Sequence, residues 1–147
     1  MIYHVQGVPA YCYTGGKPFD GAQPTVAFIH GAQNDHSVFA LQTRYFAHHG
    51  WNVLAVDLPG HGRSGGDALP SVEALADWIP AVLDAARIGE AALVGHSLGS
   101  LAVLECAARH PGRVTRIALI GPAAPMPVSE ALLDAAKRND HSAFELI

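Results

Sequence analysis

The stretch LVGHSLGS, residues 93–100, carries a Gly-x-Ser-x-Gly pattern centred on Ser97. The apolar run at residues 91–95 predicts a buried strand before it, and residues 98–110, which end at Pro-Gly, predict a helix after it. A serine placed between a buried strand and a helix is typical of a tight turn that presents a nucleophile. Ser97 is therefore the candidate catalytic residue.

The turn itself places physical demands on its neighbours. It forces Ser97 into a strained backbone conformation, and Gly95 and Gly99 leave out side chains that would collide across it. Ser97 then stands at a helix N-terminus, where free backbone N–H groups favour negative charge. The N–H of Leu98 is therefore a candidate oxyanion donor. The alternative is a serine that only caps the helix.

A second donor is expected from the loop after another buried strand, VAFIH at residues 26–30. We expect it to be the N–H of Ala32, with Gln33 as the less favoured choice. His30 and Gly31 are expected to shape this loop, and His96 to pack beside Ser97 or point away from it. The alternative is an ordinary loop at a strand end.

The stretch DLPGHGRS, residues 57–64, allows two interpretations. Asp57 at the end of a strand could hold a ribose, but no Gly-x-Gly-x-x-Gly precedes it, as a dinucleotide site requires. The favoured interpretation is architectural. Asp57 accepts backbone N–H bonds, while Gly60 and Gly62 permit positive φ.

The order of elements predicts the fold class. Apolar strands are expected at residues 26–30, 52–57, 91–95 and 115–120, with helices at 37–49, 71–87 and 98–110 between them and two short strands, 1–8 and 10–14, before them. Alternating strands and helices favour an α/β fold: a mostly parallel sheet with helices on both faces. After residue 122 prolines interrupt the chain, and helices are predicted at 130–138 and from 140 to the end.

Composition excludes several classes of protein. The chain has 147 residues, of which 50% are apolar and 15% charged, with a net charge of −4. These values fit one globular domain and no nucleic-acid partner. No leader, membrane span or metal-binding histidine pattern is seen, so we expect a cytoplasmic protein without metal or cofactor. Cys12 and Cys106 are expected to be free thiols, and a single disulfide between them is the alternative.

Together, His30-Gly31 and the motifs at residues 57–64 and 95–99 resemble the α/β-hydrolase fold superfamily, in its serine-nucleophile branch with a cap. The resemblance implies an esterase-like cycle on small carboxylic esters or related acyl bonds, through an acyl-enzyme on Ser97. It also implies that residues 1–122 are the N-terminal part of the core and residues 123–147 the start of a helical cap. Ser97 is unlike the carboxylate nucleophile of the haloalkane dehalogenase and epoxide hydrolase branches.

The superfamily's order along the chain is serine, acid, histidine. After Ser97 only His110 and His141 remain. His110 is expected roughly 18 Å away along the helix, and His141 falls in the cap. The resemblance therefore implies that acid and histidine lie beyond residue 147, on a separate chain or a further segment of the same protein. The 147 residues alone are expected to be inactive. A non-catalytic relative that binds a small molecule and an acyltransferase are the alternatives.

Overall fold

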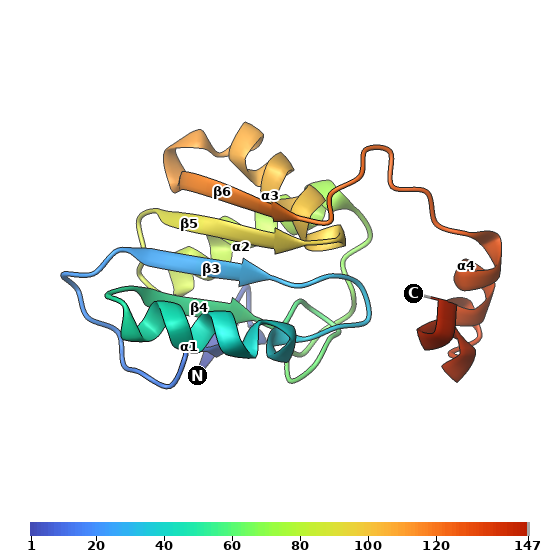
Figure 1. Cartoon of the computed structure of the whole chain (residues 1–147), viewed down its shortest axis with the longest axis horizontal. Helices are drawn as coiled ribbons and strands as arrows, with labels where there is room; N and C mark the ends of the chain where they lie inside the picture. Colours follow the sequence, from blue (N-terminus) through green and yellow to red (C-terminus); the bar gives the residue numbers. More distant parts are fainter. Residues whose placement is uncertain (147) are drawn as a thin grey trace.

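The computed structural model describes residues 1–146, which form one six-stranded sheet in the order β1-β2-β4-β3-β5-β6 (Figure 1). Four strands run parallel to one another, and the last of them forms one edge of the sheet: β3 (Thr25–Ile29), β4 (Asn52–Val56), β5 (Ala91–His96) and β6 (Val114–Ile120). An antiparallel hairpin of β1 (Ile2–Val5) and β2 (Val8–Tyr13) joins the sheet beside β4. The predicted α/β class with a mostly parallel sheet is confirmed.

The hairpin corrects one predicted boundary. The first strand was expected to run through residue 8, but the chain turns at Gln6-Gly7, and Val8 begins β2 opposite Val5. Gln6 and Gly7 have φ of 53° and 84°. Two successive residues with positive φ give the two-residue turn that matches the twist of paired strands. Gly7 was the sequence signal for this turn.

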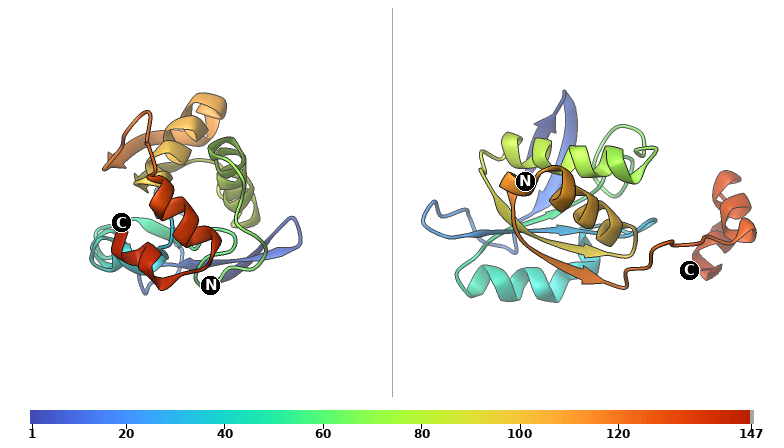
Figure 2. Two further views of the ribbon diagram at one scale, coloured as in Figure 1. Left: turned by 90° about the vertical axis from the view of Figure 1, so that its right-hand side faces the viewer. Right: turned by 90° about the horizontal axis from the view of Figure 1, so that it is seen from above.

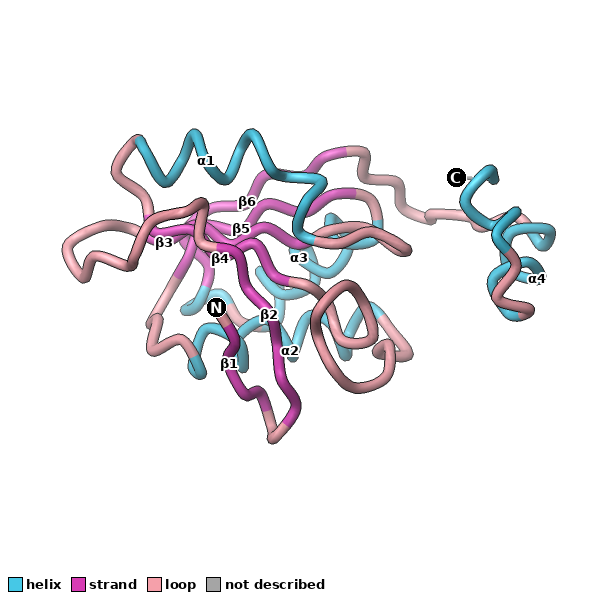
Figure 3. Tube along the Cα trace, turned by 90° about the horizontal axis from the view of Figure 1, so that it is seen from below, coloured by secondary structure: helices cyan, strands magenta, loops and turns pink. Residues whose placement is uncertain are grey.

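Helices cover both faces of the sheet (Figure 2). A 3-10 turn, η1 (His36–Phe39), leads into α1 (Ala40–His48) on one face, where Phe28 and Phe39 pack. α2 (Val72–Ala85) and α3 (Leu98–Arg109) lie together on the other face, as the view from below also shows (Figure 3). Every residue of β3 and β4 is buried because both faces are covered.

The sheet ends at β6 in the part of the chain that the structure describes. β6 follows a short 3-10 turn, η2 (Pro111–Arg113), and most of its residues are exposed, including Ile117 and Ile120. The strand thus presents an open edge with apolar side chains on it.

The C-terminal segment stands past the carboxyl ends of the parallel strands, apart from the sheet (Figure 1). It holds α4 (Glu130–Lys137), capped by Ser129 as expected, and the helix expected from residue 140 is a 3-10 helix, η3 (His141–Leu146). Ile147, the last residue of that expected helix, lies outside the described residues. No helix within residues 1–146 is both long and apolar enough to cross a lipid bilayer.

Candidate active site

Ser97 occupies the sharp turn between β5 and α3. Its φ of 52° and ψ of −121° are a conformation that non-glycine residues rarely adopt, at a cost of about 1–3 kcal/mol. Its N–H donates to the Ile120 carbonyl at 2.9 Å, and its own carbonyl accepts from the Ser100 N–H at 2.8 Å. The predicted strained turn is therefore present and is held from both sides.

Gly95 and Gly99 are required by close approach of backbone to backbone. A Cβ on Gly95 would come within 2.6 Å of the Gly99 carbonyl carbon, and a Cβ on Gly99 within 2.6 Å of the His30 carbonyl oxygen. Neither gap admits a side chain, so the turn packs directly against the end of β3.

The Ser97 hydroxyl does not cap the helix that it precedes. At two other helix starts, Ser71 and Ser129 accept the N–H of the residue three positions later, Ala74 at 3.1 Å and Leu132 at 3.2 Å. Ser97 makes no such bond. Its Oγ instead points to the Sδ of Met126, 4.0 Å away. The alternative of a purely capping serine does not fit this geometry.

The loop after β3 packs against Ser97. A Cβ at Gly31 would stand 3.0 Å from the Ser97 Cβ. The next residue is Ala32, whose N–H makes no hydrogen bond within residues 1–146. Leu98 is the first residue of α3, so its N–H has no partner in the first helical turn. Ala32 thus directly follows the residue that approaches Ser97, and Leu98 directly follows Ser97 itself. That their N–H groups bind an oxyanion stays a prediction.

His30 directly precedes this loop and is fully buried. Its Nε2 accepts the Leu58 N–H at 3.0 Å, so Nδ1 carries the proton and donates to the Gly31 carbonyl at 2.7 Å. Burial lowers the pKa of His30, which favours the neutral ring. His30 therefore ties the loop after β3 to the loop after β4.

His96 packs beside the turn. Its Nδ1 is buried and has no hydrogen-bond partner within residues 1–146. The same atom would lie 3.3 Å from a Cβ at Gly31, so the ring packs against the loop after β3. The structure gives His96 no contact with the Ser97 hydroxyl.

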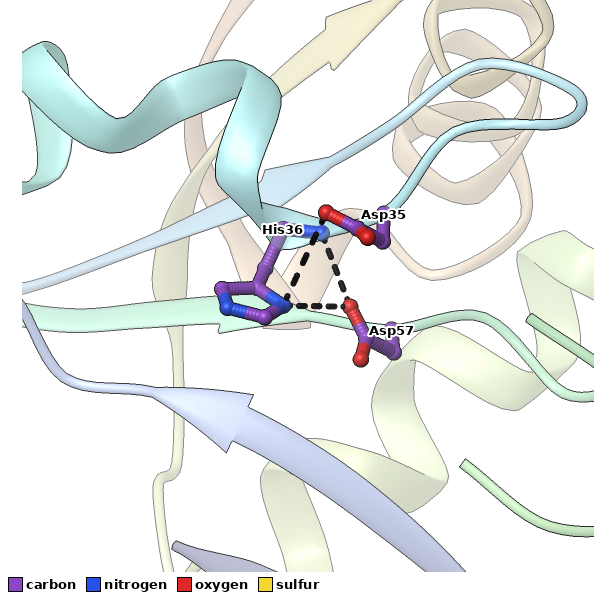
Figure 4. Close-up of side chains that lie close together, drawn as sticks. All are labelled: Asp35, His36 and Asp57. Atoms are coloured by element: carbon purple, nitrogen blue, oxygen red, sulfur yellow. Dashed lines mark hydrogen bonds and ion pairs between the residues drawn. The ribbon is translucent and has the colours of Figure 1, made fainter. Parts of the chain in front are cut away.

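Asp57 is a buried structural hub, as its architectural interpretation predicts (Figure 4). Oδ1 accepts the His36 N–H at 2.8 Å and the His36 Nδ1–H at 2.7 Å, while Oδ2 accepts the Arg63 N–H at 2.8 Å. Gly62, with φ of 53°, passes so close that a Cβ would come within 2.6 Å of the Asp57 carboxyl carbon. The sequence reasoning missed His36, although it follows the strand next to that of Asp57.

Asp35, His36 and Asp57 are residue types that bind metal ions, and their side-chain atoms lie within 4.8 Å of one another. The bonds of Asp57 use both its oxygens, and Nδ1 of His36 carries a proton in its bond to Asp57. Asp35 accepts the Ser37 N–H at 2.7 Å as the cap of η1. The geometry fits a network that joins two loops better than it fits a metal centre.

The two histidines after Ser97 are not brought to it. His110 bonds Asp77 at 2.8 Å beyond the far end of α3, and His141 begins η3. Within residues 1–146 the hydrogen bond of Ser97 Oγ goes to Met126, not to a histidine. Within residues 1–146 Ser97 therefore stands at a sharp turn without a histidine bonded to its hydroxyl.

Residues 24–145 match the family described as alpha/beta hydrolase fold. The chain is 37% identical over 115 residues to a pimeloyl-[acyl-carrier protein] methyl ester esterase of Neisseria meningitidis, covering 78% of this chain and 43% of that protein. It is 30% identical over 101 residues to an (E)-2-((N-methylformamido)methylene)succinate hydrolase of Acinetobacter baylyi, covering 68% and 38%.

A solved structure extends the likeness. Est816, described as an N-acyl homoserine lactone degrading enzyme, shares 27% identity with a TM-score of 0.77 over 98% of this chain and 54% of its own. The chain therefore spans less than half the length of both sequence relatives and about half that of Est816.

Proposed function

The chain belongs to the α/β-hydrolase fold family, and from this premise we propose that it acts as a serine hydrolase on small carboxylic esters or related acyl bonds. One observation carries the proposal. Ser97 is held at φ of 52° with a hydroxyl that caps nothing, whereas the serines at the starts of α2 and α4 do cap. A residue in a strained backbone conformation whose side chain makes no capping hydrogen bond is typical of a functional site.

The proposed chemistry uses a covalent intermediate. Ser97 Oγ attacks the carbonyl carbon while a base takes its proton. The N–H groups of Ala32 and Leu98 bind the oxyanion of the tetrahedral intermediate. This intermediate collapses as the protonated base gives its proton to the departing alcohol, and an acyl group remains on Ser97. Water then attacks the acyl-enzyme through the same oxyanion site while the base takes one of its protons, and that proton passes to Ser97 Oγ as the acid is released.

We propose that the base and its orienting acid lie outside residues 1–147. Two observations support this. No histidine bonds Ser97 within residues 1–146, and the chain spans 43% of the Neisseria esterase. The remainder of the protein is then the partner that completes the site. The 147-residue chain alone should turn over near background, because losing a triad base costs on the order of 10⁶ in rate.

A fluorophosphonate probe tests the role of Ser97 in the full-length protein. The probe should label the wild type, Ser97→Ala should abolish labelling, and Ser71→Ala should retain it because Ser71 only caps α2. Labelling that persists in Ser97→Ala would contradict the proposal.

The same protein separates hydrolysis from its two alternatives. With an ester and a primary alcohol both present, a hydrolase gives mainly the acid, whereas an acyltransferase gives mainly the new ester. A protein that only binds a small molecule gives neither and is not labelled by the probe. Product analysis by mass spectrometry distinguishes the three outcomes.

A further inference from the structure

One side chain of the segment after β6, that of Met126, contacts Ser97. From Gly121 to Glu130 every residue is exposed except Met126, which is partly buried. The contact it makes is with the proposed nucleophile, Sδ to Oγ at 4.0 Å. The Ser97 N–H also bonds Ile120, so this segment leaves the sheet directly beside the turn.

The distance places Met126 where a substrate must sit. A carbonyl carbon under attack comes within roughly 3–3.5 Å of Oγ. A sulfur atom 4.0 Å from Oγ therefore lies one atomic layer from the reaction centre. A group bonded to that carbonyl and lying on the β6 side has to pack against Met126 or displace it.

The chemistry around Met126 is apolar. Its neighbours in the segment 121–128 are Gly, Pro, Ala and Val, and the segment contains no charged side chain. On the opposite flank, toward β4, a hollow at the same end of the sheet is lined by polar side chains that include Gln33, Asn34 and His61. At this end of the sheet, the loops after β3 and β4 are therefore more polar than the segment after β6. A thioether with a flexible, unbranched chain suits alkyl groups of varied shape.

We propose that Met126 is a specificity-determining residue that contacts the substrate and selects an apolar alkyl group beside the carbonyl that Ser97 attacks. This inference rests on the proposed function for the position of that carbonyl. The substrate class is a carboxylic ester with an alkyl chain on the β6 side, and an ester with a charged group there is disfavoured because Met126 cannot hydrogen-bond to it.

The kinetic test compares p-nitrophenyl acetate with p-nitrophenyl octanoate in the full-length protein. Met126→Ala should lower kcat/KM for the octanoate ester by about tenfold relative to the acetate ester, since a short side chain leaves the alkyl group without its contact. Met126→Leu should keep the wild-type ratio, and Met126→Glu should lower it further. An unchanged octanoate-to-acetate ratio in both Met126→Ala and Met126→Glu would overturn the proposal.

A binding test separates this inference from the proposed function. Methyl-¹³C-methionine labelling reports Met126 directly, and Met126→Leu identifies its resonance by removing it. Octanoate, the hydrolysis product of the longer ester, should shift that resonance in the wild type and equally in Ser97→Ala, whereas acetate should not shift it. If the shift occurs but Ser97→Ala still hydrolyses esters, the proposed function fails and the contact stands. If octanoate leaves the resonance in place, the contact fails whatever the outcome for Ser97.

Discussion

Gly31 and Ser97 come from different loops and lie so close together that a Cβ at position 31 would stand 3.0 Å from the Ser97 Cβ. The position of Ser97 is fixed, because its N–H donates to the Ile120 carbonyl at 2.9 Å and the turn packs against β3 through Gly99. The approach of the loop after β3 to Ser97 therefore depends on the absence of a side chain at Gly31.

Gly31→Ala should impair hydrolysis more than it impairs folding. The added methyl pushes the loop from Ser97 by a few tenths of an ångström, and with it the N–H of Ala32, so kcat/KM should fall about tenfold or more. Ester hydrolysis and urea unfolding of the full-length protein measure the two effects. Gly112→Ala is the matched control because a Cβ there meets nothing within 4 Å. Equal kcat/KM values for the two variants would show that the contact has no catalytic consequence.

Asp57→Asn should destabilise the protein without altering the chemistry directly. The carboxylate accepts three N–H groups from His36 and Arg63, and an amide presents its own N–H to at least one of them. The free energy of unfolding should fall by about 2–4 kcal/mol, because buried donors lose their acceptor. Asp84→Asn removes an exposed carboxylate paired with Arg113 and should change stability little. Similar unfolding midpoints for both variants would contradict the hub role of Asp57.

The fold and the candidate nucleophile were predictable because their signals are local. Apolar runs mark the strands, and the glycines on either side of Ser97 mark the turn. The bond from His36 to Asp57 spans 21 positions and the contact from Met126 to Ser97 spans 29. Both depend on how strands are ordered in the sheet, and no local pattern specifies that. The hairpin turn at Gln6-Gly7 is a different case. Gly7 was a local signal for a turn, but the first strand was predicted to continue through it to residue 8.

The buried His30 should make folding sensitive to mild acid. Burial lowers its pKa in the folded protein, so between that pKa and about 6.5 the unfolded chain binds a proton that folded His30 does not. The unfolded state then binds more protons, and the free energy of unfolding falls as pH falls through about 6.5, by up to about 1.4 kcal/mol per pH unit.

Urea unfolding at about pH 7.5 and about pH 5.5 measures this slope, because the two values bracket the ordinary pKa of histidine. His30→Gln removes the titrating ring and should flatten the slope, whereas His48→Gln, at an exposed histidine, should leave it unchanged. A slope that is the same in all three proteins would exclude His30 as its source.

The two cysteines should behave as inert thiols. Cys12 and Cys106 are free and fully buried, so the alternative of a disulfide is wrong. Burial raises the pKa of Cys12 to about 12 and that of Cys106 to about 11, which leaves little thiolate at neutral pH. A thiol reagent such as Ellman's reagent should react with neither in the folded chain and with both in guanidinium without added reductant. Rapid reaction in the folded state would show that one of these sites is open.

The strain at Ser97 should be measurable as stability. Glycine adopts φ of 52° without a Cβ penalty, so Ser97→Gly should be more stable than Ser97→Ala. Glycine is also a better helix cap than alanine. Ser71 caps α2 at a φ of −151°, where no strain is expected, so comparing Ser71→Gly with Ser71→Ala measures the capping preference alone. The glycine advantage at Ser97 should exceed that at Ser71 by about 1 kcal/mol or more in urea unfolding. If the two advantages are equal, the turn stores no strain. An excess at Ser97 would mean that the serine is retained at a cost to stability, which a residue kept for chemistry explains and a helix cap does not.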